Sequence, residues 1–209
     1  MSVRDVPWWG IMSSAAPPVL LAAGWTIAAS LQSLPYDPVA DTVSALAGIG
    51  ATDRWVMTLA FAMAGACEMV TGLMLWPSRM AGRLVLIAGG LAGILVAVFP
   101  VHIGDGAPGS HIAWATVGLT ALAVWPAAAS RHGPAVPWAL RPEVSIWAAV
   151  ILLALLAWFG VELITSVGQA GLAERVLGEA QSGWPFVVVI SCRHPMTLTV
   201  RSRALHGYG

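Results

Sequence analysis

Residues 144–165 read VSIWAAVILLALLAWFGVELIT, a run whose only charged side chain is Glu162, close to its end. The hydrocarbon core of a bilayer is about 30 Å thick and is crossed by a helix of about 20 apolar residues. This run therefore predicts one transmembrane helix. Because lipid leaves the backbone no outside hydrogen-bond partners, and the other apolar runs also have helical length, the chain is predicted to be an all-α integral membrane protein.

Working outward from this run, the same criterion predicts a bundle of six transmembrane helices. The charge-free stretch between Asp5 and Asp37 is too long for the apolar part of a signal peptide, about 7–15 residues, so it is expected to be the first span. The last span carries Glu174, Arg175 and Glu179 in its first turns, which leaves five spans with a peripheral sixth segment as the alternative. The six predicted spans are residues 8–31, 55–76, 84–99, 111–128, 144–165 and 173–192.

The composition excludes two other classes of protein. Only 10% of the residues are charged and 58% are hydrophobic, whereas a soluble domain has about 25% charged residues. The basic residues are all arginines, and their number, 10, equals the number of acids. No basic cluster is available to follow nucleic-acid phosphates, so no nucleic-acid partner is expected.

The arginines also predict the orientation, because cytoplasmic loops are enriched in basic residues. With six spans, one side of the membrane receives only Arg54 and Arg175. Residues 1–193 are thus expected to form a single domain in the bacterial cytoplasmic (inner) membrane with both termini inside, and residues 194–209 a mobile cytoplasmic tail. The side expected to face the cytoplasm receives all the other arginines: Arg4, Arg79, Arg83, Arg131, Arg141, Arg193, Arg201 and Arg203.

The first outer loop contains the sequence YDPVADTVSAL at residues 36–46. Asp37 followed by Pro38 is typical of an N-cap and the first residue of a helix, so a short interfacial helix is expected from Pro38 onward. Asp41 and Ser44 would share one face of that helix. They are either ordinary helix residues, with Asp41 favoured by the helix dipole, or catalytic candidates in an outer site.

The second outer loop, residues 99–111, adds His102, Asp105 and His111 at the same surface. Imidazole and carboxylate groups are ligands of zinc, so these three residues are candidates for a divalent-metal site, with His111 also a catalytic candidate. Histidine titrates near neutral pH, which makes a proton relay a second interpretation. The third is that the loop holds only caps, turns and headgroup anchors.

Glu68 lies inside the second span, roughly 20 Å from its outer end by helical rise. An ionisable group at this depth is costly and suggests a function. The alternative is a carboxyl group that is protonated or hydrogen-bonded within the bundle, with Cys67 and Thr71 as local partners. In the last span, the i, i+4 spacing of Arg175 and Glu179 predicts a pair.

The third span contains a G-x-x-x-G motif, GGLAG at residues 89–93. Small residues let membrane helices approach closely. The motif is expected to pack helices within one chain, or otherwise to form a dimer face; a homo-oligomer is not otherwise indicated.

Two of these motifs together resemble a known family. YDP at 36–38 with DTVSAL at 41–46, and the Phe99-Pro100 ending of the third span before the loop to His111, are similar to the bacterial membrane family called domain of unknown function 998. The resemblance runs from about residue 15 to Cys192. It implies an integral membrane protein of six or a similar number of spans, without an established activity, and directs attention to Asp41, Ser44 and His111.

Three functions are consistent with these residues. The first is a non-enzymatic protein with a polar pocket on the extracytoplasmic face, which binds a lipid or small molecule or serves as a membrane partner subunit. The second is a membrane hydrolase in which a metal held by histidine and aspartate activates water. The third is a small proton-coupled carrier that uses Glu68. Convergence of the outer histidines with Asp41 would favour the second, and a cavity that reaches Glu68 would favour the third.

Overall fold

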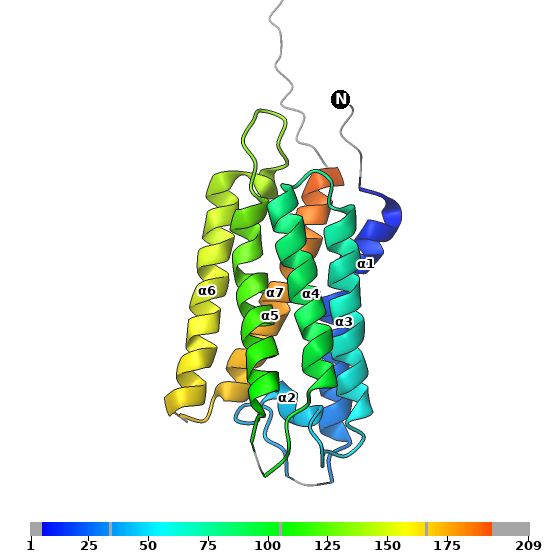
Figure 1. The fold of residues 1–209 in the computed structure, drawn as a ribbon, viewed down its shortest axis with the longest axis vertical. Coiled ribbons are helices and arrows are strands. Elements are labelled where there is room, and N and C mark those ends of the chain that lie inside the picture. The colour runs from blue at the N-terminus through cyan, green and yellow to red at the C-terminus, as the bar shows by residue number, and fades with distance from the viewer. Residues whose placement is uncertain (1–5, 34, 105, 166, 194–209) are drawn as a thin grey trace, which may run out of the picture.

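The computed structural model describes residues 6–33, 35–104, 106–165 and 167–193 (Figure 1). Within these ranges all regular secondary structure is helical, as the sequence predicts. The six long helices are α1 (Trp8–Ser30), α3 (Trp55–Met74), α4 (Met80–Val98), α5 (Gly109–Ala129), α6 (Pro142–Thr165) and α7 (Ala170–Arg193). Two short ones are α2 (Val43–Leu46) and the 3-10 helix η1 (Trp138–Leu140).

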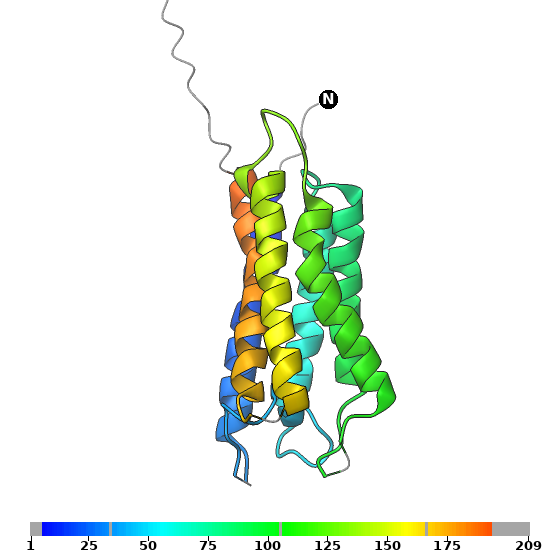
Figure 2. The ribbon, with the colours of Figure 1, turned by 90° about the vertical axis from the view of Figure 1, so that its left-hand side faces the viewer.

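The six long helices form a closed ring. Each long helix packs against the next long helix along the chain, including α1 against α3, which follow one another with only the short α2 between them. Helix α7 closes the ring by packing against both α6 and α1. Figures 1 and 2 show their axes running side by side, with successive helices reversing direction. One end of the bundle therefore carries the start of α1, η1 and the end of α7, and the opposite end carries α2.

Five of these helices, α1, α3, α4, α5 and α6, are long and apolar enough to cross a membrane. Their outward faces carry exposed large apolar side chains, among them Leu59 and Met63 on α3 and Trp147 and Ile151 on α6. Exposed apolar surface on this scale is expected for contact with lipid. The chain is thus a multi-pass membrane protein of the helical class. Helix α7 has comparable length, 24 residues, but its first half is polar.

Glycines set the spacing of the central helices. Gly65 on α3 faces Gly90 on α4, and a Cβ added at Gly90 would lie 3.0 Å from Met69. On the other side of α4, a Cβ at Gly89 would lie 2.7 Å from the Leu122 side chain of α5. The G-x-x-x-G region therefore packs helices within one chain, the first of its two predicted roles.

The helix in the first outer loop begins later than predicted. Thr42, and not Asp37, is the N-cap of α2, and its Oγ1 accepts a hydrogen bond from Ala45 N at 3.3 Å. Asp37 instead accepts from Val39 N with its carboxylate, at 2.9 Å, and from Asp41 N with its carbonyl, at 2.7 Å. These bonds close a turn before a helix can propagate, because an aspartate side chain competes for local backbone donors.

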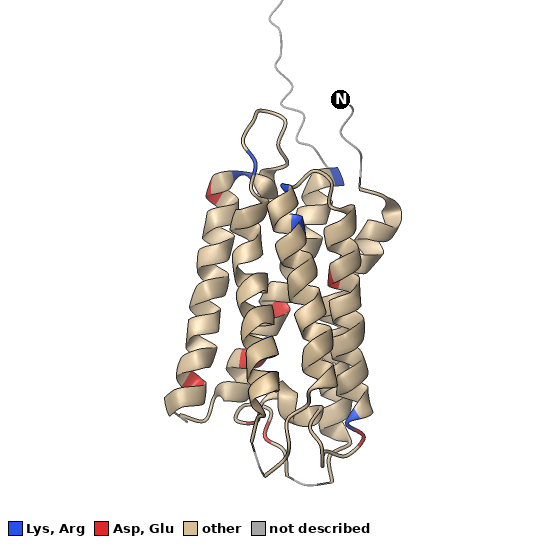
Figure 3. Cartoon of the chain, viewed as in Figure 1, with Lys and Arg blue, Asp and Glu red and all other residues tan. Residues whose placement is uncertain are grey.

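The charges divide between the two ends of the bundle. Figure 3 shows the basic residues concentrated at the end where α1 begins and α7 ends. Chain order places the described members of the larger arginine group there: Arg79, Arg83, Arg131, Arg141 and Arg193. Arg4, Arg201 and Arg203, like the predicted tail at 194–209, lie outside the described residues.

Candidate functional site

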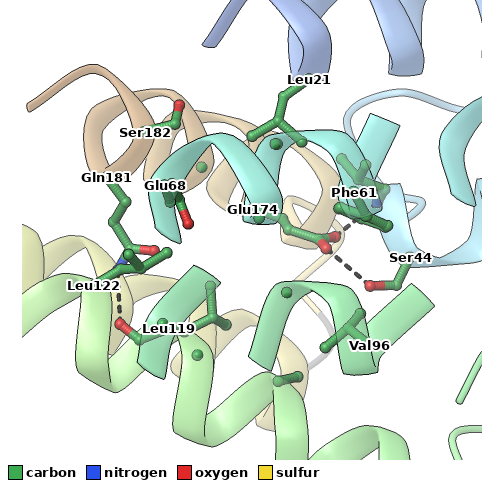
Figure 4. Close-up of a pocket in the computed structure, with 18 of the residues that line it drawn as sticks. Leu21, Ser44, Phe61, Glu68, Val96, Leu119, Leu122, Glu174, Gln181 and Ser182 are labelled. Atoms are coloured by element: carbon green, nitrogen blue, oxygen red, sulfur yellow. Dashed lines mark hydrogen bonds between the residues drawn. The ribbon is translucent and has the colours of Figure 1, made fainter. Parts of the chain in front are cut away.

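A cavity of about 120 Å³ lies inside the ring of helices (Figure 4). Its walls come from α1, α2, α3, α4, α5 and α7, whereas α6 contributes none of the described lining residues. Most of the wall is apolar or glycine. Its larger apolar side chains are Leu21, Trp25, Val43, Phe61, Val96, Trp114, Leu119 and Leu122.

Five polar side chains also line this cavity: Ser44, Glu68, Glu174, Gln181 and Ser182. No lysine, arginine or histidine is among the described lining residues. The polar part of the wall thus contains two carboxyl groups and no basic side chain to neutralise them.

Glu68 is 5% exposed, and its side chain has no hydrogen-bond or ion-pair partner among the described residues. Thr71, one of the two neighbours expected to bond it, is engaged elsewhere, because its hydroxyl lies 2.9 Å from Ser13 Oγ and donates to the backbone oxygen of Cys67 at 2.9 Å. Figure 4 shows the Glu68 carboxylate directed into the cavity.

Gln181 presents a second unsatisfied oxygen. Its side chain is 1% exposed, and its Nε2 donates to Leu119 O at 2.8 Å across the gap between α7 and α5. This bond fixes the amide, and its Oε1 is left without a hydrogen-bond partner among the described residues. Buried polar atoms are nearly always paired in native proteins, so Glu68 and Gln181 together mark this part of the cavity as unusual.

The α2 end of the cavity is lined by a contact between α7 and α2. Glu174 accepts a hydrogen bond from Val43 N at 2.7 Å through Oε2, and from the Ser44 hydroxyl at 3.1 Å through Oε1. A carboxylate on the first backbone N–H groups of a helix is favourable because it satisfies a free donor and faces the positive end of the helix dipole. Glu174 thereby holds α2 in place as part of the cavity wall.

Arg175 holds the rest of the first outer loop. Its Nη1 donates to Pro38 O at 2.6 Å, and its Nη2 donates to the Tyr36 hydroxyl at 2.6 Å. The Tyr36 hydroxyl in turn lies 3.1 Å from Asp41 O, to which it donates. Burial raises the pKa of Tyr36 above its ordinary value, and the nearby Arg175 guanidinium counters this only in part. The predicted pair of Arg175 with Glu179 does not form, since Arg175 turns toward the loop and Glu179 Oε1 is unpaired among the described residues.

The sequence matches the family described as protein of unknown function (DUF998) over residues 14–191. The chain belongs to the DUF998 family. The resemblance carried by the YDP and Phe99-Pro100 motifs is therefore confirmed. No curated protein matches this chain. No solved structure matches it either.

Of the outer-loop candidates in this DUF998 protein, Ser44 lines the cavity and Asp41 does not. The Asp41 carboxylate turns back into its own loop, where Oδ2 accepts from Asp37 N at 2.8 Å. His111 is 6% exposed, and its Nδ1 lies 2.8 Å from Phe99 O, which ties the start of α5 to the end of α4. His102 is exposed, and its backbone N donates to Gly106 O at 3.2 Å.

A metal site at the outer face remains a prediction. The described residues contain no group of three or more His, Cys, Asp or Glu side chains that would hold a metal ion. Asp105, one of the three residues predicted to bind it, lies outside the described residues.

The residues of α7 that line the cavity were not predicted as site residues from the sequence. Glu174, Gly178, Gln181 and Ser182 follow the i, i+4, i+7, i+8 spacing of one helix face. In the DUF998 chain this face is polar and directed inward, opposite to the pattern that identifies a lipid-facing span. That periodicity is the signal that would have found Gln181.

Proposed function

We propose that this DUF998 protein binds a small molecule in the cavity enclosed by its helix ring. The observation that carries the proposal is that two oxygen-bearing groups of the same cavity wall lack a hydrogen-bond partner among the described residues: the buried Gln181 Oε1 and the Glu68 carboxyl group. Leaving a buried polar atom unsatisfied costs about 1–3 kcal/mol. A bound molecule that supplies hydrogen-bond donors would remove this cost at Gln181 and would give the Glu68 carboxyl group a partner.

The rest of the lining supports the same function. Small-molecule sites are concave and mostly apolar, with a few converging polar groups that orient the ligand. This cavity has aromatic walls at Trp25, Phe61 and Trp114, and its polar groups come from α2, α3 and α7. Because these helices are far apart in the sequence, the site exists only when the ring is closed.

The proposed arrangement in the membrane has six spans, with α7 as the sixth, in a bacterial inner membrane. The arginine-rich end then faces the cytoplasm, so that α2 and the part of the cavity that it lines lie toward the extracytoplasmic side. The arginine distribution supports this orientation. The polar face of α7 is compatible with a span because Glu174, Gln181 and Ser182 face the cavity and not lipid.

Filling the cavity tests the proposal. An added Cβ at Gly178 meets no atom within 4 Å, and Gly178 lines the cavity, so Gly178→Leu would occupy it. Gly183 is also on α7 with nothing within 4 Å of its added Cβ, but it does not line the cavity, which makes Gly183→Leu the matched control.

The measurement is the thermal midpoint of the purified protein in phosphatidylcholine nanodiscs, with cyclohexylamine or cyclohexanol as the probe. Saturating ligand at about 100 times Kd stabilises a protein by about 2.7 kcal/mol, which raises the midpoint by about 5–10 °C for a chain of this size. At least one probe should produce this rise in the wild type and in Gly183→Leu, and not in Gly178→Leu. Equal behaviour of all three proteins would exclude the cavity as a binding site.

A proton-coupled carrier is the second candidate function. The cavity that contains Ser44 at the α2 end also contains Glu68, about 13 residues into α3, which is the feature expected of a carrier that uses Glu68. In proteoliposomes with an internal pH-sensitive dye, a carrier should show ligand-dependent proton flux that Glu68→Gln abolishes. Ligand binding without any proton flux would contradict the carrier function, and binding would then be the function that remains.

A further inference from the structure

We infer that the cavity selects a small protonated amine, with the ammonium group bound at Glu68 and Gln181. This inference rests on the proposed function and specifies its ligand. It follows from the hydrogen-bonding state of the polar groups in the wall, from the aromatic residues beside them and from the size of the cavity.

The atoms without a described partner at Glu68 and Gln181 are oxygens, which accept hydrogen bonds. The Gln181 amide nitrogen is committed to Leu119 O at 2.8 Å, so its Oε1 is the atom left for a ligand. Glu68 contributes a carboxyl group without a partner among the described residues. An ammonium group carries several N–H donors and a positive charge, so it satisfies both oxygens and provides the counter-charge that a buried carboxylate needs.

The other polar side chains do not compete for this role. The Ser182 hydroxyl turns back to its own helix and donates to Glu179 O at 3.4 Å. The Glu174 carboxylate already accepts bonds from Val43 N and Ser44, yet its negative charge still adds to the preference for a cation. No described lining residue would offer a compensating charge to an anion.

Aromatic rings complete a site for a cation. Trp25, Phe61 and Trp114 line the cavity, and a cation over an aromatic face is stabilised by the quadrupole of the ring. Trp25 already has the Arg175 guanidinium 5.7 Å from its ring centroid, so Phe61 and Trp114 are the rings left for the ammonium group of a ligand.

The cavity volume limits the size of the amine. A cavity of about 150 Å³ takes up benzene, so about 120 Å³ restricts the ligand to an amine with no more than one small ring. A phospholipid amino head group is disfavoured, because its phosphate would have to enter a wall with two carboxyl groups and no described basic side chain.

The experiment compares two probes of nearly equal shape, cyclohexylamine and neutral cyclohexanol, by calorimetric titration into the nanodisc-embedded protein. The wild type is expected to bind the amine about 10- to 100-fold more tightly, as for a charged hydrogen bond. Glu68→Gln should remove this preference, and Glu68→Asp should retain most of it. The matched control is Glu162→Gln, because Glu162 is also buried but bonds Trp158 and Gln169 outside the cavity.

The outcomes separate the two levels of the proposal. If cyclohexanol binds as tightly as cyclohexylamine, or Glu68→Gln keeps the amine preference, the choice of an amine is wrong while binding in the cavity stands. If neither probe binds the wild type, both the inference and the proposed function fail. The wild-type comparison alone decides between these outcomes should Glu68→Gln not fold.

Discussion

Glu174 accepts a hydrogen bond from the hydroxyl of Ser44, 130 residues earlier in the chain, at 3.1 Å. Its second carboxylate oxygen accepts from the backbone of Val43 at 2.7 Å. One side chain therefore joins the last helix of the ring to the short helix over the cavity, while still forming part of the cavity wall. Changes at Glu174 should affect both the loop and the site.

Glu174→Ala is expected to release α2. Hydrogen bonds to a charged group contribute about 1.5–3 kcal/mol each, and this substitution removes two of them, so hydrogen exchange at residues 43–46 should accelerate by about tenfold or more. Glu179→Ala is the control on the same helix, because Glu179 Oε1 has no described partner. Equal acceleration in both variants would show that Glu174 does not anchor α2.

Gly171→Ala is expected to push the first outer loop away from α7. A Cβ at this position would lie 2.7 Å from Pro38 O and even closer to Asp41 O, and both are backbone atoms that cannot rotate aside. Overpacking of this kind costs about 1–3 kcal/mol, which a lowered thermal midpoint would report. Gly183→Ala has open space at its Cβ and should be neutral or slightly stabilising.

The buried phenol of Tyr36 predicts a stability that depends on alkaline pH. Its pKa in the folded protein lies above the ordinary value of 10.0, so the phenol holds its proton more strongly in the folded state than in the unfolded state. The corresponding stability is present below about pH 10 and is lost as the pH rises through the raised pKa of the folded protein. Thermal midpoints measured across this range should fall more steeply for the wild type than for Tyr36→Phe, and parallel curves would contradict the prediction.

Glu68→Met is expected to raise the stability of the protein without ligand. The substitution replaces a buried, unpaired carboxyl group by an apolar side chain of similar length, which should contribute about 1–3 kcal/mol. The same variant should lose amine binding, a trade-off typical of functional sites. A lowered thermal midpoint would mean that Glu68 has a stabilising partner in the folded protein.

The apolar runs predict the bounds of the long helices to within a few residues, because the length of a span is fixed by the bilayer and not by tertiary contacts. The prediction was least complete for α7, which begins at Ala170 and has a polar inner face. The polar face lines the cavity, and the rest of the cavity wall comes from five other helices. The sequence of α7 alone therefore does not show why this face is polar.

The candidate site was predicted in part for a similar reason. Ser44 and Glu68 were identified from the sequence, and both line the cavity. Asp41 was expected beside Ser44, but local backbone donors in its own loop take its carboxylate. Gln181 and Glu174 have partners 62 and 130 residues away, and one sequence contains no information on such pairings.

The separation between Ser44 and Glu174 also has a consequence during biosynthesis. A ribosome adds about 5–20 residues per second, so the 130 residues between these partners take roughly 7–26 s to synthesise. Throughout that interval the nascent chain has an unanchored first loop and a ring open on one side. Truncation before α7 would leave the chain in this state, so the ring and the cavity wall become complete only when the final helix has been made.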